Sequence, residues 1–325
     1  MPVFSLRKRE EYGKLKQIGS DSMIPFEPIQ LCHREAYLPY LAGASHRGCA
    51  YSFVNQYLWG RQFGAVVENM LVIFSQYNCK SVYLFPCGEG DPQPAIEAIR
   101  ADAKERGIPC RLVGLTQEDC ALLERLYPGK LNMHIDRDAF EYVYDINDLA
   151  DLAGRKYQKK RNHLNRFRQA NPDYVLEPIT EENIGQAEAL VAKWYELREA
   201  ADPLSDFAME KAAMRRAFRH WKELELEGLL LKIETGAVAM TMGSFLQPDT
   251  FDVHFEKALD IVDGAYPAIN QGFAAVLREK YPELRYLNRE DDMGLEGLRK
   301  AKLSYCPDHM VEKYWVHFVE DGYDY

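Results

Sequence analysis

The sequence predicts an α/β (α+β) protein built from two successive halves that repeat the same order of elements. Each half contains a meander of three strand-like runs, and each meander is followed by an amphipathic helix, a strand, a helix and a last strand. The chain has 325 residues, which is long for one hydrophobic core and typical of two domains. We therefore expect domains at residues 1–147 and 148–325.

In the first half, apolar runs and turn residues set the order of elements. The Glu68-Asn69 turn joins two strands of the meander, CGEGDPQP breaks the sheet before a helix, and Gly107 ends that helix. We expect strands at 26–30, 65–67, 70–74, 81–86 and 111–115, an extended section at 131–144, and helices at 33–41, within 52–63, at 96–103 and at 117–127.

The second half begins with a long basic helix at 148–170, which Asn171-Pro172 ends. A meander follows, with turns at Thr235-Gly236 and Gln247-Pro248-Asp249. We expect strands at 174–178, 229–233, 237–246, 250–258, 285–287 and 309–319, and further helices at 184–195, 206–223, 266–277 and 295–304.

Composition narrows the classes of function. The net charge is −10, which argues against broad attraction to DNA or to an anionic membrane, so any polyanion site must be local. Seven scattered cysteines without CxxC spacing indicate reduced thiols. The charged start MPVFSLRKREEYGKLK predicts no secretory signal, and no run of eighteen apolar residues predicts a membrane span. We expect a cytoplasmic protein; its oligomeric state is not predicted.

Five stretches carry a resemblance to a known family. They are SFVNQYLWG (52–60), KKRNHLNRF (159–167), HFEKA (254–258), YPAINQGF (266–273) and NREDDMGLEGLRKAKLSYCP (288–307). The chain resembles bacterial proteins related to the C-terminal domain of phosphatidylglycerol lysyltransferase. The resemblance implies two tandem GNAT-like (acyl-CoA N-acyltransferase) domains and transfer of an acyl or aminoacyl group to an amine or hydroxyl acceptor.

The strand FDVHFEK supplies the candidate catalytic residues. Strict alternation would place Asp252, His254 and Glu256 on one face of the sheet. If that face lines a cleft, Glu256 is a candidate general base for an attacking amine, with His254 as its partner or as the acid. The alternative is an ordinary strand with one wet face.

The segment RYLNREDDMGLEGLRKAKLSY (285–305) reads as strand, loop and helix, and α/β proteins place ligands outside the carboxyl ends of their strands. Its cations would hold a phosphate or carboxylate while the acidic loop orients an amine. The alternative is a solvated loop with a salt-bridged helix start. The candidate substrate-binding residues are Asn288, Arg289, Glu290, Arg299, Lys300, Lys302 and Tyr305.

The basic helix is a candidate site for an RNA end or another anion. Seven cations lie within GRKYQKKRNHLNRFR without one acid among them. The alternative is a solvated helix. The candidate contacts are Lys159, Lys160, Arg161, His163 and Arg166.

The donor and the cofactor remain open between two classes. GNAT enzymes present a glycine-rich turn to the pyrophosphate of acyl-CoA, whereas this chain has LDIVDGAYPAIN, with Gly264 as its one glycine. That departure disfavours acyl-CoA and favours either another donor, such as aminoacyl-tRNA, or no catalysis. The free amides at the start of the next helix are a weak signal for an anion site. No motif for a metal or for nucleotide hydrolysis is present. The alternative to a transferase is a noncatalytic protein that binds tRNA or a small anionic ligand.

Overall fold

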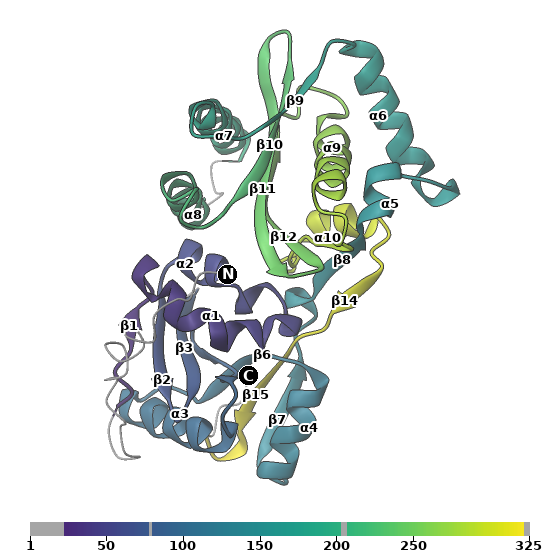
Figure 1. The fold of residues 1–325 in the computed structure, drawn as a ribbon. Helices are drawn as coiled ribbons and strands as arrows, with labels where there is room; N and C mark the ends of the chain where they lie inside the picture. The colour runs from purple at the N-terminus through teal and green to yellow at the C-terminus, as the bar shows by residue number, and fades with distance from the viewer. Residues whose placement is uncertain (1–22, 78–79, 203–206, 322–325) are drawn as a thin grey trace, which may run out of the picture. The chain divides into compact units, whose positions relative to one another are not determined.

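The structure, a computed structural model, describes residues 23–77, 80–202 and 207–321. Contacts divide the chain into two compact units, the first formed by 1–136 and 312–325 and the second by 137–311 (Figure 1). The predicted lack of a secretory signal concerns the segment 1–22, which lies outside the described residues, as do Cys79 and Asp206.

The first unit holds a mixed sheet with the strand order β1-β2-β3-β4-β6-β15-β7, and β5 pairs with β3. Its meander turns through Glu68 and Asn69, both with positive φ, as a two-residue hairpin requires. Its elements are β1 (Glu27–Pro28), α1 (Arg34–Ala42), α2 (Phe53–Trp59), β2 (Gln62–Val67), β3 (Met70–Tyr77), β4 (Lys80–Leu84), β5 (Cys87–Gly88), α3 (Pro92–Arg106), β6 (Arg111–Leu115), α4 (Gln117–Leu126), β7 (Leu131–Ile135) and β15 (Tyr314–Phe318).

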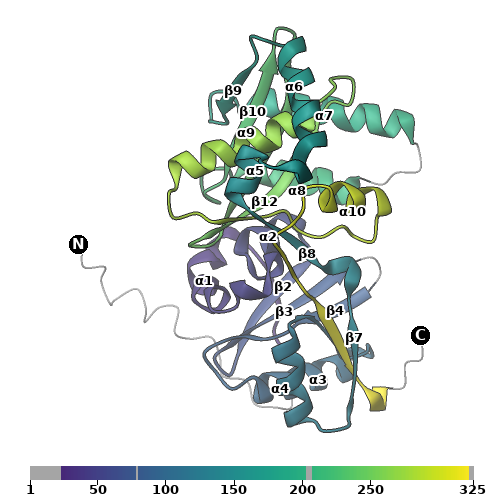
Figure 2. The same ribbon diagram turned by 90° about the vertical axis from the view of Figure 1, so that its right-hand side faces the viewer.

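The second unit holds a sheet with the order β14-β8-β13-β12-β11-β10-β9. Helices α7 and α8 lie on one side of it and α9 on the other, and α9 runs beside α5 and α6 (Figures 1 and 2). Its elements are β8 (Glu141–Asp145), α5 (Ile146–Asp151), α6 (Gln158–Ala170), β9 (Val175–Pro178), α7 (Ile184–Ala201), α8 (Ala208–Arg219), β10 (Glu227–Ile233), β11 (Gly236–Gln247), β12 (Thr250–Ala258), α9 (Ala265–Lys280), β13 (Tyr286–Asn288), α10 (Glu296–Leu303) and β14 (His309–Val311).

Both units repeat one structural feature around their meanders. The third meander strand, β4 or β12, is followed by a helix and then by a strand that pairs with it in parallel, β6 or β13. Each sheet is otherwise antiparallel and is flanked by helices. The two cores are built separately, with Ile96 and Leu112 in the first, and Phe251 and Ile269 in the second. These features agree with the predicted pair of similar halves.

Two strands belong to a different unit from the one that a single boundary between residues 147 and 148 would assign to them. Strand β8 pairs with β13 and β14 of the second unit, although it precedes the expected boundary. Strand β15 pairs with β6 and β7 of the first unit, although it ends the chain. The chain therefore passes between the units at Asp136 and again at Glu312.

Two predicted elements are divided in the structure. The long basic helix at 148–170 is α5 and α6, because Leu152 adopts φ 48° and Gly154 adopts φ 81°, which no continuous α-helix contains. The last strand at 309–319 is β14 and β15, which belong to different sheets. Among the described residues, no helix is both long and apolar enough to span a bilayer.

Candidate functional site

A gap in the pairing of β12 with β13, here called the opening, marks the candidate site in the second unit. The two strands are paired at three positions, Thr250 with Tyr286, Phe251 with Leu287 and Asp252 with Asn288. Beyond the last pair, β12 continues to Ala258, whereas β13 ends and the chain turns into a loop. The pairing therefore stops after Asp252, and the loop after β13 contacts the rest of β12 through its side chains.

A β-bulge turns Glu256 to the side of the sheet that α9 covers. On β11, Met242 and Gly243 are neighbours, but their partners on β12 are Phe255 and Val253, so one extra residue lies in β12. Glu256 accepts a hydrogen bond from Asn270 of α9 at 3.1 Å. The prediction that Glu256 shares a face with Asp252 and His254 is therefore wrong, because the bulge reverses the alternation.

Glu256 forms an ion pair across the opening with Arg289, the first residue after β13. The distance from Arg289 Nη2 to Glu256 Oε1 is 2.9 Å, and the side chains are 13% and 10% exposed. Burial would lower the pKa of Arg289, but the Glu256 carboxylate and neighbouring tyrosines outweigh it and raise that pKa. The guanidinium thus stays charged inside the protein.

Three buried polar atoms around this pair have no hydrogen-bond partner among the described residues. They are Arg289 Nη1, Asn270 Oδ1 and Thr241 Oγ1. Thr241 lies directly opposite Glu256 in the β11–β12 register, so both side chains share one face. A buried donor or acceptor without a partner costs about 1–3 kcal/mol. Their grouping around one ion pair indicates a site that is completed by a polar ligand.

The ring of Tyr305 contacts two cations, Arg289 and Lys160. The Arg289 guanidinium carbon lies 5.0 Å from the centre of the Tyr305 ring, and Lys160 Nζ of α6 lies 3.8 Å from the same centre. Tyr305 is 5% exposed, and its backbone carbonyl accepts a hydrogen bond from Tyr157 at 3.0 Å. Burial, followed by repulsion from Arg289, lowers the pKa of Lys160 to about 8 although Glu256 opposes this.

His254 lies apart from Glu256, in a second polar group on the other face of β12. Its Nε2 is 2.9 Å from Ser244 Oγ, and its Nδ1 is 3.1 Å from Glu290 Oε1 and 3.6 Å from Asp252 Oδ2. The structure therefore pairs His254 with Glu290, not with Glu256 as predicted. Candidate residues His254 and Glu290 come together, but away from the Arg289–Glu256 pair.

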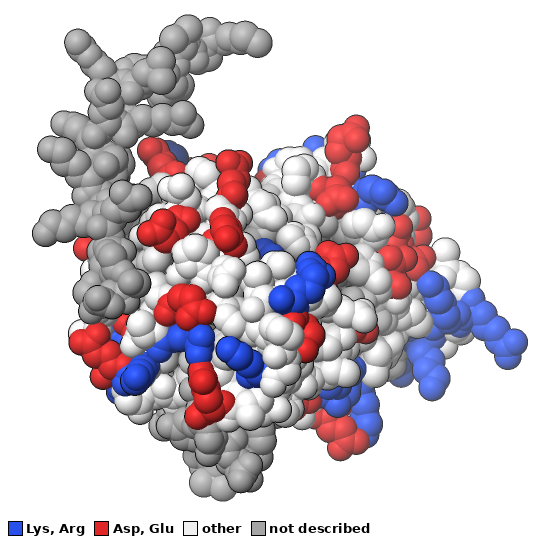
Figure 3. All heavy atoms as spheres, turned by 90° about the horizontal axis from the view of Figure 1, so that it is seen from below, with Lys and Arg blue, Asp and Glu red and all other residues white. Residues whose placement is uncertain are grey.

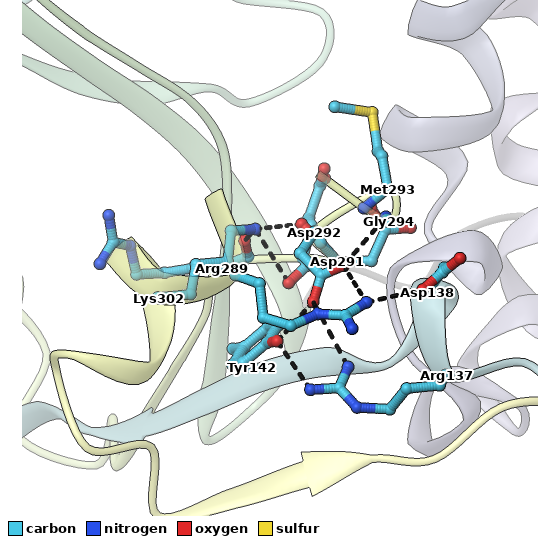
Figure 4. A network of polar contacts seen from close by, with 11 residues as sticks. Arg137, Asp138, Tyr142, Arg289, Asp291, Asp292, Met293, Gly294 and Lys302 are labelled. Atoms are coloured by element: carbon cyan, nitrogen blue, oxygen red, sulfur yellow. Dashed lines mark hydrogen bonds and ion pairs between the residues drawn. The ribbon is translucent and has the colours of Figure 1, made fainter. Parts of the chain in front are cut away.

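Asp292 anchors the loop that follows β13 (Figure 4). Its buried carboxylate receives two hydrogen bonds from Arg299 at 2.9 Å, one from Tyr142 at 2.5 Å and one from the Gly294 N–H at 2.9 Å. Burial would raise the pKa of Asp292, but these donors outweigh it and hold the pKa well below its usual range. Arg299 also pairs with Asp138 at 2.6 Å, so its charge is shared between two carboxylates.

Lys302 binds the backbone of the same loop. It is 8% exposed and donates to the backbone carbonyls of Arg289, Glu290 and Asp291 (Figure 4). Three carbonyl partners satisfy all protons of an ammonium. Burial and the neighbouring Glu290 carboxylate raise the pKa of Asp291 to about 7, against the opposing charge of Lys302.

The other two candidates of this segment have different surroundings. Asn288 is 1% exposed, donates to Glu141 at 2.5 Å and accepts from the Glu290 N–H at 2.8 Å, so it shapes the loop. Lys300 is exposed and pairs with Glu296 one turn earlier on α10. Of the seven predicted substrate-binding residues, Arg289 and Tyr305 are those that the structure places with Glu256.

The predicted contacts of the basic helix α6 divide between two sides. Lys160 points inward to Tyr305, and Arg161 donates to the carbonyls of Leu152 and Gly154, where α5 ends. A hollow of about 450 Å³ runs along the outer side of α6. It is lined by Lys159, Asn162, His163, Asn165, Arg166 and Gln169.

The start of α9, where GNAT enzymes hold a pyrophosphate, is closely packed and acidic. Gly264 adopts φ 80°, and a Cβ at this position would lie 2.6 Å from the carbonyl oxygen of His163 in α6. Asp263 lies 3.5 Å from His163 and 3.4 Å from Arg166, and Asp260 pairs with Arg198 at 2.7 Å. Pro267 in the first turn has no N–H to offer. These features disfavour a bound pyrophosphate.

Comparison with known proteins agrees with this architecture. Residues 42–317 match the family described as phosphatidylglycerol lysyltransferase, C-terminal. The chain belongs to this family. The fold predicted from the sequence, two tandem GNAT-like domains, is confirmed.

Two solved structures and one curated protein illustrate the range of similarity. A conserved protein of unknown function from Bacteroides thetaiotaomicron is 36% identical, with a TM-score of 0.83 over 91% of this chain and 100% of that one. A structure of L-PGS from Bacillus licheniformis is 16% identical, with a TM-score of 0.59 over 93% and 94%. An uncharacterized protein of Mycoplasmoides gallisepticum is 26% identical over 189 residues, which are 57% of this chain and 58% of its own length.

Three residues of the site escaped the sequence analysis. Asn270 belongs to the family motif YPAINQGF, where it stands on the buried face of α9 with Phe273. A polar residue on the apolar face of a predicted helix is unusual, and this position could have identified Asn270 as a candidate. Thr241 and Tyr144, whose ring centre is 5.6 Å from the Arg289 guanidinium carbon, lie within apolar strands and gave no such signal.

Proposed function

We propose that this member of the phosphatidylglycerol lysyltransferase C-terminal family is an aminoacyltransferase that holds the aminoacyl end of a charged tRNA between β12 and β13. The observation that carries the proposal is the buried Arg289–Glu256 pair with three unpaired polar atoms around it. The family and the fold support acyl or aminoacyl transfer as the class of reaction.

The unpaired atoms match an aminoacyl group in both charge and hydrogen-bonding type. Asn270 Oδ1 and the Glu256 carboxylate are acceptors, which suit an α-ammonium group. Arg289 Nη1 is a donor, which suits the ester carbonyl oxygen and the negative charge that develops on it during attack. An aminoacyl ester is already activated, so positioning and one proton transfer are the main tasks of the protein.

The role proposed for Glu256 changes from general base to ammonium binding. Both carboxylate oxygens of Glu256 are already engaged, Oε1 by Arg289 and Oε2 by Asn270, so neither is left to take a proton from an acceptor. The carboxylate remains well suited to a cation. His254, on the other face of β12, is then a residue that positions Glu290 and the loop rather than the acid of the reaction.

The surroundings of α9 and α6 favour tRNA over acyl-CoA as the donor. Gly264 packs closely against α6 and Pro267 lacks an N–H, so the start of α9 leaves little room and few amides for a pyrophosphate. The outer side of α6 offers Lys159, His163 and Arg166 along a hollow. On the face drawn in Figure 3, acidic and basic side chains are interspersed, in keeping with a local rather than broad site for a polyanion. Charged tRNA is a donor that is available to a cytoplasmic protein, which is the location that we expect.

The first experiment follows radiolabelled amino acids from bulk charged tRNA into products in extracts freed of nucleic acid. The tRNA and free amino acid are removed by chromatography at mildly acid pH, so that ester and amide products both survive. We expect wild-type protein to form such products and Glu256→Gln to lose at least 100-fold in rate. Glu234→Gln, on the exposed turn between β10 and β11, is the matched control and should keep the wild-type rate. Equal rates for wild type and Glu256→Gln would contradict the site.

Binding experiments separate transfer from the alternative of a noncatalytic tRNA-binding protein. The logarithm of tRNA affinity should fall linearly with the logarithm of salt concentration. Replacing Lys159 and Arg166 with Ala should make this slope shallower by about 1 for each cation removed. Lys193→Ala, on the exposed side of α7, should leave it unchanged. Retained tRNA binding without any transfer by wild type would favour the noncatalytic alternative. A rise in melting temperature with millimolar CoA would instead favour acyl-CoA.

A further inference from the structure

A second group beside the proposed aminoacyl pocket has the features of a proton carrier. Lys160 lies on α6 with its side chain turned inward, and its ammonium nitrogen is 3.8 Å from the centre of the Tyr305 ring. Arg289 contacts the same ring at 5.0 Å and leads directly to Glu256. Lys160 is partly exposed, whereas Arg289 and Glu256 are nearly buried.

The charges around Lys160 do not balance. Glu256 on β12 is the one carboxylate among the groups that act on it, whereas Arg289, from the loop after β13, is a second cation. Tyr305 and Cys306, which follow α10, complete the titratable groups facing it. On its own helix, Lys159 faces the outer hollow and Arg161 donates to the end of α5. Two cations therefore compete for one buried anion, and Glu256 already bonds to Arg289.

We propose that Lys160 is the catalytic base of the transfer reaction, taking the proton of the acceptor and returning it to the leaving oxygen. This rests on the proposed function. In the step, the neutral amine accepts a proton as the acceptor's hydroxyl or amine bonds to the ester carbonyl carbon. The ester C–O bond to the tRNA then breaks, and the ammonium gives its proton to the ribose oxygen. No further reactant is required.

The protonation state of Lys160 supports this role. A pKa of about 8 leaves an appreciable share of the amine neutral near pH 7.5, whereas an ordinary lysine is almost entirely protonated there. A group whose pKa lies near the working pH transfers protons in both directions efficiently. The interactions that lower this pKa, burial and Arg289, are those that form the pocket itself.

The first test follows amine reactivity, which does not depend on activity. The protein is labelled briefly with acetic anhydride between pH 6 and 11, and peptides containing Lys160 and Lys159 are compared by mass spectrometry. We expect half-maximal labelling of Lys160 near pH 8, at least one pH unit below that of Lys159. Coincident labelling curves for the two neighbours would overturn the proposal.

The second test asks whether the titratable amine is required for transfer. Lys160→Arg keeps the positive charge but does not lose its proton, so we expect transfer to fall at least 100-fold while binding of an aminoacyl analogue stays within 3-fold. Lys160→Ala should be partly rescued by added methylamine, in proportion to its neutral form. Lys193→Arg is the control. Normal transfer by Lys160→Arg sinks the role of Lys160 alone, whereas no transfer by wild type sinks the proposed function and this role together.

Discussion

The guanidinium of Arg289 lies 2.9 Å from the carboxylate of Glu256 at the point where strands β12 and β13 have parted. Each group is nearly buried, so each depends on the other for its charge to be tolerated. Arg289 Nη1, Asn270 Oδ1 and Thr241 Oγ1 are buried around this pair without a hydrogen-bond partner among the described residues. The pair thus links the stability of the second unit to its ability to bind a ligand.

The first prediction concerns the coupling of this pair. Glu256→Gln and Arg289→Gln should each lower the free energy of unfolding by about 2–4 kcal/mol, because each leaves one buried charge uncompensated. The double substitution should cost less than the sum by about 1–3 kcal/mol. Urea unfolding of the four proteins measures this coupling. Strict additivity would show that the two charges do not interact.

The second prediction concerns Asp292. Asp292→Asn removes the charge that Arg299, Tyr142 and Gly294 bind, and should cost about 3 kcal/mol at pH 7. Because the pKa of Asp292 is lowered by folding, its stabilisation is complete above the unfolded value near 4 and is lost as the pH falls through the folded value. The cost of the substitution, followed by urea unfolding, should therefore shrink below pH 4. An equal cost at pH 3 and pH 7 would contradict this.

The third prediction, for the adjacent Asp291, has the opposite sign. Its pKa is raised to about 7, so between pH 4 and 7 the folded protein binds more protons than the unfolded chain and loses stability as the pH rises. Asp291→Asn should raise the melting temperature at pH 8, by an amount equivalent to about 1–2 kcal/mol, and leave it nearly unchanged at pH 4. Destabilisation at pH 8 would show that the ionised carboxylate is favourable there.

The fourth prediction concerns the contact of α6 with the start of α9. Gly264→Ala would place a Cβ 2.6 Å from the His163 carbonyl oxygen and 2.8 Å from Phe167 Cβ, at φ 80°, so we expect a loss of about 2–3 kcal/mol. Gly185→Ala, in α7 with open space around the new Cβ, is the control and should stabilise by about 0.5–1 kcal/mol. Equal melting temperatures for the two variants would mean that α6 moves away without cost.

The order of elements could be predicted from the sequence because local signals define it. The hairpin turn at Glu68-Asn69, the helix end at Gly107 and the meander turns all depend on residues next to one another. The exchange of β8 and β15 between the units could not, because strand partners are chosen by contacts far apart in the sequence. The run 309–319 has no turn signal at Glu312, although β14 before it and β15 after it belong to different sheets.

The candidate site shows the same limit. Alternation along FDVHFEK placed Glu256 beside His254, and the bulge that separates them has no signature in the strand itself. Lys160 was grouped with the candidate RNA- or anion-binding residues of the basic helix, although it stands four residues before Leu164 and seven before Phe167, both buried. That spacing predicts an inward side chain. Arg289 and Tyr305 were found because the family motif contains them, whereas their mutual contact required the fold.

The measurement that tests the central claim most directly is the binding of hydrolysis-resistant aminoacyl adenosines to the purified protein. A panel of 3′-aminoacylamino-3′-deoxyadenosines with the twenty amino acids is titrated calorimetrically into wild type, Glu256→Gln and Glu234→Gln. We expect at least one compound to bind wild type and Glu234→Gln equally and to bind Glu256→Gln at least 10-fold more weakly, because its ammonium group loses a carboxylate. Binding that is absent throughout the panel, or that Glu256→Gln retains, would contradict an aminoacyl site between β12 and β13.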